Sequence, residues 1–167
     1  NAFVDPISGE IGKTIAFCVS QNHAAKITQI LNEFADKLFP GKYQSDFAMQ
    51  VTSWIPDAQQ YTINFTNNRL GGKGNFFDLY QTSKTRVCVT VGMMTTGYDC
   101  PDLLNVCLMR PIFSPTDFIQ IKGRGTRKCN FANKEVLKDK SLIENIEPEK
   151  LQKSKFKLFD FFANCEF

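Results

Sequence analysis

Short, nearly continuous apolar runs alternate along the chain with longer amphipathic stretches, and this alternation restricts the fold more than any other feature. Strands that are covered by helices on both faces have this composition, because both faces need apolar side chains. The runs are rich in strand formers and occupy residues 13–19, 47–52, 86–91, 103–109 and 156–162. The sequence therefore predicts five strands in one domain.

The stretches between these runs predict helices. Ser20 is a capping residue type, Pro40 and Gly41 stop the first helix, and the residues between them place apolar side chains on one stripe of a 3.6-residue period. These side chains belong to Ile27, Ile30, Leu31, Phe34, Ala35 and Leu38. A second helix is expected from residues 56–57 onward, with Ala58, Tyr61 and Phe65 on its inner face. Residues 67–75, with three glycines, predict a loop. Strands that alternate with helices predict an α/β domain with a mostly parallel sheet.

Composition excludes several classes of protein. The 167 residues are 43% apolar and 22% charged, which is typical of one globular domain. No run approaches the roughly 20 apolar residues of a membrane span, and the first ten residues carry acids where a signal peptide is basic. We expect a soluble, cytoplasmic chain with no membrane partner. The cysteines in apolar runs (Cys18, Cys88, Cys107 and Cys165) predict buried thiols, and His23 has no partner at metal-ligand spacing, so no metal site is predicted.

Positive charge is concentrated near one end of the chain. Residues 120–157 contain eleven Lys or Arg and five Asp or Glu, a local balance of +6 within a net charge of +3, which leaves −3 for the rest. Clustered cations are typical of phosphate binding. A solvated lysine-rich loop without a partner explains the same pattern. Residues 128–155, which are polar and contain Pro148, predict an excursion or mobile loop before the last strand.

One apparent nucleotide motif near the start has the wrong spacing. Residues 9–14 end in Gly12-Lys13-Thr14 like a phosphate-binding loop, but Ile7 stands where that motif needs glycine. The order is also wrong, because this loop must follow a strand and open a helix, whereas Lys13 precedes the first strand. We therefore expect Lys13 to have no role in binding phosphate.

A second candidate lies within residues 120–127, QIKGRGTR. If this segment is helical, Gln120, Gly123, Arg124 and Arg127 lie on one face that presents an amide and two guanidinium groups to an anion. Each glycine in a helix costs about 1 kcal/mol relative to alanine, which suggests the close approach of another group. A basic surface helix with ion-paired arginines is the alternative.

A third candidate lies at residues 95–101, TTGYDCP, directly after a predicted strand. Small and hydroxylated residues at the carboxyl end of a parallel strand lie where α/β sheets bind ligands, and Asp99 could accept a hydrogen bond from a ribose hydroxyl. A turn in which Asp99 acts only as a cap is the alternative.

Taken together and in this order, the motifs resemble motifs IV, V and VI in the second RecA-like domain of superfamily 2 helicases. The segment MTTGYDCPDLLNVCLMRPIFSPTDFIQIKGRGTR is similar to the motor (restriction, R) subunit of type I restriction-modification enzymes, and FKLFDFF resembles the strand that follows there. The resemblance covers about residues 12–167. It implies a RecA-like three-layer domain over residues 1–167, which we expect to be a fragment of a larger chain.

The resemblance also implies a function: the C-terminal motor lobe of an ATP-dependent double-stranded DNA translocase/endonuclease, a hydrolase of a restriction system. Arg124 and Arg127 would face the γ-phosphate as catalytic residues. Gln120, Gly123, Gly97 and Asp99 would bind the nucleotide. Ser20, Thr95 and Thr96 would contact the DNA backbone.

The same resemblance implies partners that lie outside this chain. ATP and Mg²⁺ would be held mainly by an upstream first RecA-like domain, so the isolated chain is expected to be inactive. Specificity and methyltransferase subunits would complete the complex. Alternatives are a lobe of another superfamily 2 DNA repair or remodelling helicase, and a non-catalytic nucleic-acid-binding module.

Overall fold

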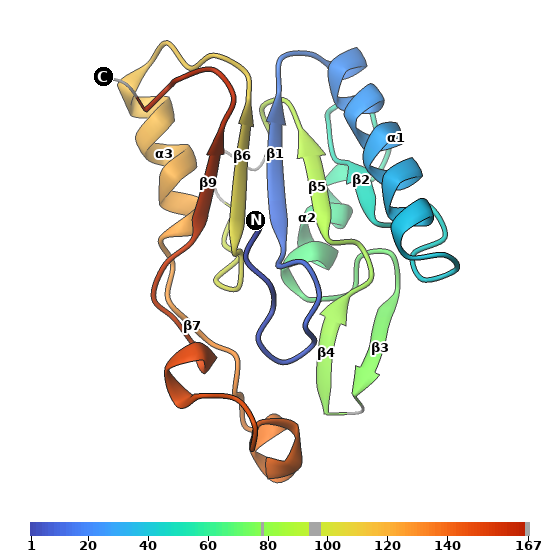
Figure 1. Cartoon of the computed structure of the whole chain (residues 1–167). Coiled ribbons are helices and arrows are strands. Elements are labelled where there is room, and N and C mark those ends of the chain that lie inside the picture. The colour runs from blue at the N-terminus through green and yellow to red at the C-terminus, as the bar shows by residue number, and fades with distance from the viewer. Residues whose placement is uncertain (78, 94–97, 166–167) are drawn as a thin grey trace.

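A five-stranded sheet, in which every pairing is parallel, forms the centre of the molecule (Figure 1). The computed structural model describes residues 1–77, 79–93 and 98–165. The strand order is β2-β5-β1-β6-β9. The strand bounds are β1 Thr14–Cys18, β2 Ala48–Gln50, β5 Val87–Thr90, β6 Asn105–Met109 and β9 Lys157–Asp160. Each of the five predicted runs contains one of these strands, so the predicted parallel α/β sheet is confirmed.

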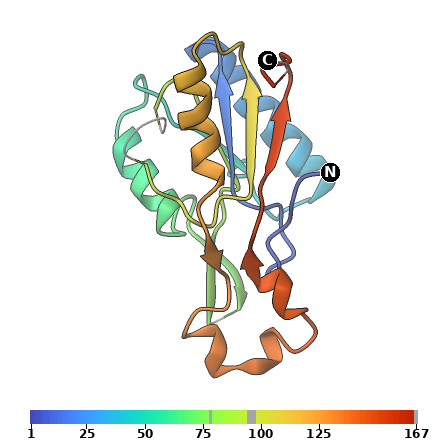
Figure 2. The same cartoon turned by 90° about the vertical axis from the view of Figure 1, so that its left-hand side faces the viewer.

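Helices cover both faces of this sheet and give the three layers of a RecA-like domain (Figure 2). Helix α1, Gln21–Leu38, lies on one face, and α2, Ala58–Thr66, and α3, Pro115–Gly125, lie on the other. Side chains that alternate along β1 supply both cores: Ile15 and Phe17 pack with α2 and α3, whereas Ala16 and Cys18 pack towards α1. The predicted fold class is therefore confirmed.

Helix α1 has the predicted extent, but part of its apolar stripe is exposed. Ala35 is buried against the sheet, whereas Phe34 and Leu38 are 59% and 69% exposed. Ser20 caps the helix by accepting a hydrogen bond from the backbone N–H of His23 at 3.2 Å. The stripe is thus wider than the surface that the sheet offers to it.

The prediction of a loop over residues 67–75 was wrong at its end. Strand β3, Lys73–Phe77, begins inside that range and pairs antiparallel with β4, Tyr80–Ser83. The sequence does not indicate this strand, because glycine is depleted in strands and residues 71, 72 and 74 are glycines. Pairing with β4 forms the strand despite this local preference.

The charged excursion between α3 and β9 has secondary structure and a small core of its own. It contains β7, Cys129–Asn130, paired antiparallel with β8, Gln152–Lys153, at the lower end of the molecule in Figure 1. Between them lie three 3₁₀ turns, Val136–Lys138, Lys140–Leu142 and Pro148–Leu151. Phe131, Val136 and Leu151 are buried together with Ile7 and Leu104, which attaches the excursion to the main domain.

All six cysteines are free thiols, but the prediction that Cys165 is buried was wrong. Strand β9 ends at Asp160, so Cys165 lies in the turn beyond it and is exposed, and Cys107 is only half-buried. Burial raises the pKa of the Cys18 thiol to about 11. Within the described ranges, no helix combines the length and the apolar character that crossing a membrane requires.

Candidate ATP-facing site on α3

Helix α3 positions the arginines of the QxxGRxxR segment. Ser114 caps it by accepting from the backbone N–H of Asp117 at 3.4 Å, and Pro115 takes the first turn, where no N–H is needed. Ile121 and Gly125 are buried against the domain, whereas Gln120 is exposed. The helix ends at Gly125, so the prediction that Arg127 lies on the helical face was wrong.

The structure nevertheless brings both arginines to the segment that follows the TTGYDCP motif. Arg124 Nη1 donates a hydrogen bond to the carbonyl oxygen of Tyr98, and Arg127 Nε lies 3.5 Å from Asp99 Oδ1. Two motifs that are about 25 residues apart in the sequence therefore share one site. Tyr98 itself is buried in the core beneath α3, which fixes its carbonyl in place.

The two arginines differ in how firmly they are held. Arg124 is half-buried, and burial lowers the pKa of its guanidinium, as does the nearby positive charge of Arg127, while Asp99 opposes both effects. Arg127 and Asp99 are 58% and 62% exposed, so water screens their ion pair. The Arg127 guanidinium therefore can leave Asp99 for an anion at little cost.

The other predicted site residues are distributed more widely. Gly123 lies next to Arg124 with open space where a side chain would begin. Ser20 lies at the carboxyl end of β1, and no described contact joins it to the arginines; its hydroxyl caps α1. Thr95, Thr96 and Gly97 lie outside the described residues.

The two glycines of α3 have different surroundings, which gives a matched test of the packing. A Cβ on Gly125 would overlap the aromatic ring of Phe156, whereas a Cβ on Gly123 would meet no atom within 4 Å. We expect Gly125→Ala to lower the free energy of unfolding by roughly 1 to 3 kcal/mol through overpacking. Gly123→Ala should be neutral or stabilising by up to about 1 kcal/mol, because alanine favours helix. Urea denaturation followed by circular dichroism measures both, and equal effects of the two substitutions would contradict this packing.

Lys13, in the segment that imitates a phosphate-binding loop, is a core residue. Its side chain is 1% exposed, and Nζ lies 3.0 Å from Asp102 Oδ1. Nζ also lies 5.0 Å from the centroid of the Phe65 ring and donates to the carbonyl oxygen of Thr66 at 3.4 Å. With its ammonium group used inside the fold, Lys13 is not available to a phosphate, in agreement with the prediction.

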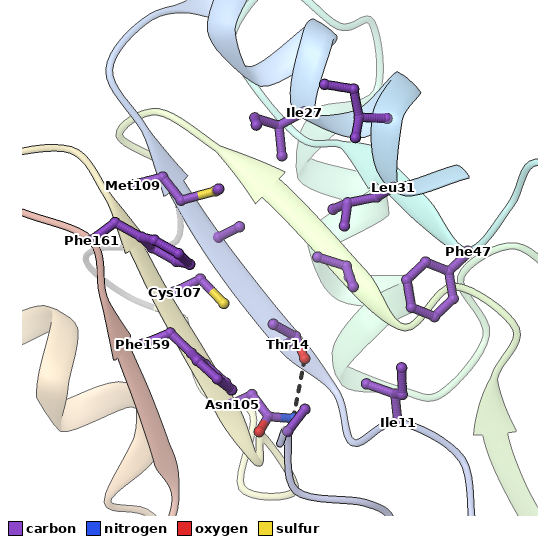
Figure 3. Close-up of a pocket in the computed structure, with 14 residues that line it drawn as sticks. Ile11, Thr14, Ile27, Leu31, Phe47, Asn105, Cys107, Met109, Phe159 and Phe161 are labelled. Atoms are coloured by element: carbon purple, nitrogen blue, oxygen red, sulfur yellow. Dashed lines mark hydrogen bonds between the residues drawn. The ribbon is translucent and has the colours of Figure 1, made fainter. Parts of the chain in front are cut away.

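A large cavity on the opposite face of the sheet does not fit a nucleotide phosphate. It measures about 350 Å³ and lies beside α1, over the half of the sheet that α1 leaves uncovered (Figure 3). Ile27 and Leu31 of α1 line one side, and Cys107, Met109 and Phe159 line the other. None of its lining residues is charged. Arg124 at the end of α3 and Arg127 just beyond it, in contrast, offer positive charge to an anion.

Sequence reasoning missed the groups that hold the site together. The backbone carbonyl of Tyr98 and the pair Lys13–Asp102 carry no motif, and Lys13 and Asp102 are 89 residues apart. Within the described ranges, no group of three or more His, Cys, Asp or Glu side chains has a metal-binding arrangement.

Comparison with known proteins identifies the relatives of this fold. No family model matches the chain. The EcoKI endonuclease subunit, a type I restriction enzyme of Escherichia coli K12, is 29% identical over 136 residues, which cover 79% of this chain and 10% of that protein. A fragment of a putative HsdR subunit of a type I restriction enzyme from Vibrio vulnificus YJ016 superposes with a TM-score of 0.64 and 27% identity, covering 98% of this chain and 25% of that one.

A more distant similarity concerns the fold alone. The C-terminal domain of the DEAD-box protein Dbp5 superposes with a TM-score of 0.50 and 11% identity, covering 89% of this chain and 60% of that one. The chain spans about a tenth of the length of the curated relative and a quarter of the Vibrio chain. The chain is similar in sequence to these two type I restriction enzyme subunits, and its RecA-like fold is similar to that of the C-terminal domain of Dbp5.

Proposed function

We propose that this chain is the C-terminal motor lobe of an ATP-dependent translocase on double-stranded DNA, of the kind that type I restriction enzymes carry. Arg124 and Arg127 are its catalytic residues, and they face the γ-phosphate of ATP held on a first RecA-like lobe. Gln120, Gly123, Gly97 and Asp99 complete the nucleotide side of the site. The parent protein is a hydrolase, and this lobe alone does not turn over ATP.

The observation that carries this proposal is the junction of the two motifs. The Tyr98 carbonyl holds Arg124, and Asp99 holds Arg127 at the surface. Phosphoryl transfer depends mainly on positioned positive charge, because the transferring group spreads its charge over oxygens. Arg124, which is anchored, and Arg127, which is exposed and weakly paired, can both contact the transferring phosphoryl group when the first lobe closes against this one.

Part of the phosphate chemistry comes from outside this lobe. Phosphoryl transfer by such motors needs a cradle for the β- and γ-phosphates and a Mg²⁺ ion. Lys13 is buried in an ion pair, and we assign both the cradle and the Mg²⁺ ligands to the first RecA-like lobe of the same protein. The residues here fit the charge of the terminal phosphate, which is the part of ATP that a second lobe reaches.

We assign DNA contacts to Ser20, Thr95 and Thr96 and to the basic excursion. Exposed lysines of the excursion include Lys134, Lys138, Lys140 and Lys150, although Lys138 and Lys150 pair with neighbouring glutamates. In the complete cytoplasmic assembly, specificity and methyltransferase subunits supply sequence recognition. This lobe needs only backbone contacts that tolerate any sequence.

Affinity for DNA should therefore depend on salt and little on sequence. Cations that neutralise phosphates release counterions, so four phosphate contacts lower the affinity roughly 100-fold between 50 and 200 mM salt. Fluorescence anisotropy with two unrelated duplexes measures this. An affinity that is unchanged over this range would exclude a role for the excursion lysines.

The test of the function is movement along DNA by the full-length polypeptide. Displacement of a third strand from a triplex, at increasing distances from the entry site, reports translocation on duplex DNA. We expect displacement that requires ATP and is delayed in proportion to distance. A lobe of another superfamily 2 helicase would instead separate the duplex strands, and a non-catalytic module would bind DNA without any effect of ATP.

A further inference from the structure

A buried lysine of the excursion holds the loop that carries Asp99. Lys153 is 7% exposed, and its Nζ donates to the carbonyl oxygen of Pro101 at 2.9 Å. Taking an ammonium group out of water is costly unless hydrogen bonds compensate it. Burial lowers the pKa of Lys153, and the nearby groups of Cys100, Cys129 and Asp102 favour its charged form. This contact therefore fixes the turn at Pro101 firmly.

Lys13 holds the same loop through separate contacts. Its Nζ lies 3.0 Å from Asp102 Oδ1 and 3.6 Å from Cys100 Sγ, and Cys100 Sγ lies 3.1 Å from the same carboxylate oxygen. Residues 100–102 are thus held by Lys13, which precedes β1, and by Lys153, the last residue of β8. Asp99 lies one residue beyond this doubly held turn, so its backbone has little freedom on that side.

Lys153 is also connected to Arg127, through the pairing of strands β7 and β8. Cys129 of β7 pairs with Lys153 of β8, and Arg127 lies two residues before Cys129. Lys153 is therefore connected to Arg127 by the pairing of β8 with β7, and to Asp99 by its hydrogen bond to the carbonyl of Pro101. Arg127 and Asp99, the two residues that Lys153 connects in this way, form an ion pair with each other.

We propose that Lys153 is a positioning residue for catalysis: by tying the β7–β8 strands to the loop at Pro101, it fixes the place from which Arg127 reaches a phosphate. The inference rests on the proposed function, since it acts through Arg127. It assigns a task to the excursion of residues 128–155, which supplies no group to the site itself. A shift of about 1 Å in a catalytic group can cost roughly 100-fold in rate.

The test is Lys153→Met in the full-length polypeptide, because methionine keeps most of the stem and removes the donor. We expect kcat for DNA-stimulated ATP hydrolysis to fall roughly 10- to 100-fold while KM for ATP changes less than about threefold. Lys37→Met is the control: Lys37 is an exposed lysine in the last turn of α1, and its Nζ lies 5.7 Å from the centroid of the Phe34 ring, away from the excursion. It should leave kcat unchanged.

A double-mutant cycle with Arg127→Ala separates positioning from a structural effect. If Lys153 acts through Arg127, Lys153→Met should cause no further loss once Arg127 is absent. An equal loss in both backgrounds, or a kcat for Lys153→Met within twofold of the parent, would overturn the inference. Should Lys153→Met fail to fold, Lys153→Gln, which removes the ammonium group and shortens the side chain, carries the same cycle. If Arg127→Ala alone leaves hydrolysis intact, it is the proposed function that fails.

Discussion

Arg127→Ala in the full-length polypeptide is expected to lower DNA-stimulated ATP hydrolysis by roughly 10³-fold or more, the loss that accompanies removal of an arginine from a phosphoryl-transfer site. Arg124→Ala should have an effect of the same order. The physical reason is that the guanidinium stabilises charge that develops only in the transition state, so ATP binding should change far less than kcat. Steady-state hydrolysis and equilibrium binding of a nucleotide, measured on the same samples, separate the two effects.

Replacement of either arginine by lysine should rescue little of this activity. Lysine keeps the charge but loses the planar fork that donates to two phosphate oxygens. Lys122→Ala, a change at an exposed residue of the last turn of α3, is the control and should leave hydrolysis within about twofold. A folded Arg127→Ala variant that hydrolyses ATP within a few-fold of the parent would make Arg127 a surface residue paired with Asp99 and nothing more.

Arg86→Ala should have the largest effect on stability, lowering the free energy of unfolding by about 3 to 5 kcal/mol. Arg86 is fully buried, with Nε donating to the carbonyl of Ile11 at 2.7 Å and Nη1 to that of Ser83 at 2.9 Å. Its Nε also lies 4.0 Å from Glu10 Oε2, and Glu10 is itself buried. Removal of the guanidinium therefore leaves the carbonyls of Ile11 and Ser83 without this donor and takes away one of the two cations that face Glu10, the other being Lys42.

Urea denaturation of the 167-residue chain tests this, with Lys84→Ala as the control. Lys84 pairs with Asp46 at 2.9 Å near the surface, so its loss should cost less than about 1 kcal/mol. The double variant Arg86→Met/Glu10→Gln removes both buried charges and should recover part of the loss. If Arg86→Ala costs no more than Lys84→Ala, the buried network around Glu10 does not hold this end of the sheet.

The strands and the first two helices were predictable because their patterns are local. The apolar run of β1 and the spacing of Ala58, Tyr61 and Phe65 record burial directly, since each residue meets the core at a fixed period. Hairpin β3–β4 was not predictable, because Gly74 inside β3 and the two glycines just before it disfavour a strand, which forms by pairing with β4. For α1 the apolar stripe predicted more burial than the structure has, since Phe34 is apolar but exposed.

In the candidate site, too, some features could be predicted from local sequence and others depend on the fold. The residue types of QIKGRGTR pointed to an anion, but α3 ends at Gly125, where the ring of Phe156, from beyond the excursion, leaves no room for a side chain. The contact of Arg124 with the Tyr98 carbonyl involves a backbone atom, so the sequence contains no signal for it. Likewise, nothing in the sequence distinguishes Lys153 from the other lysines of the excursion. Only the fold shows its hydrogen bond to the carbonyl of Pro101.

The most direct test of an arginine-supplying lobe is the affinity of the full-length polypeptide for ADP with aluminium fluoride, a mimic of the transferring phosphoryl group, compared with ADP alone. Arg127→Ala should weaken binding of the mimic by roughly 100-fold or more and leave ADP binding within about threefold, because only the mimic presents the charge that Arg127 meets. Equal affinities of parent and variant for the mimic would contradict the account, since Arg127 would then make no contact with the transferring phosphate.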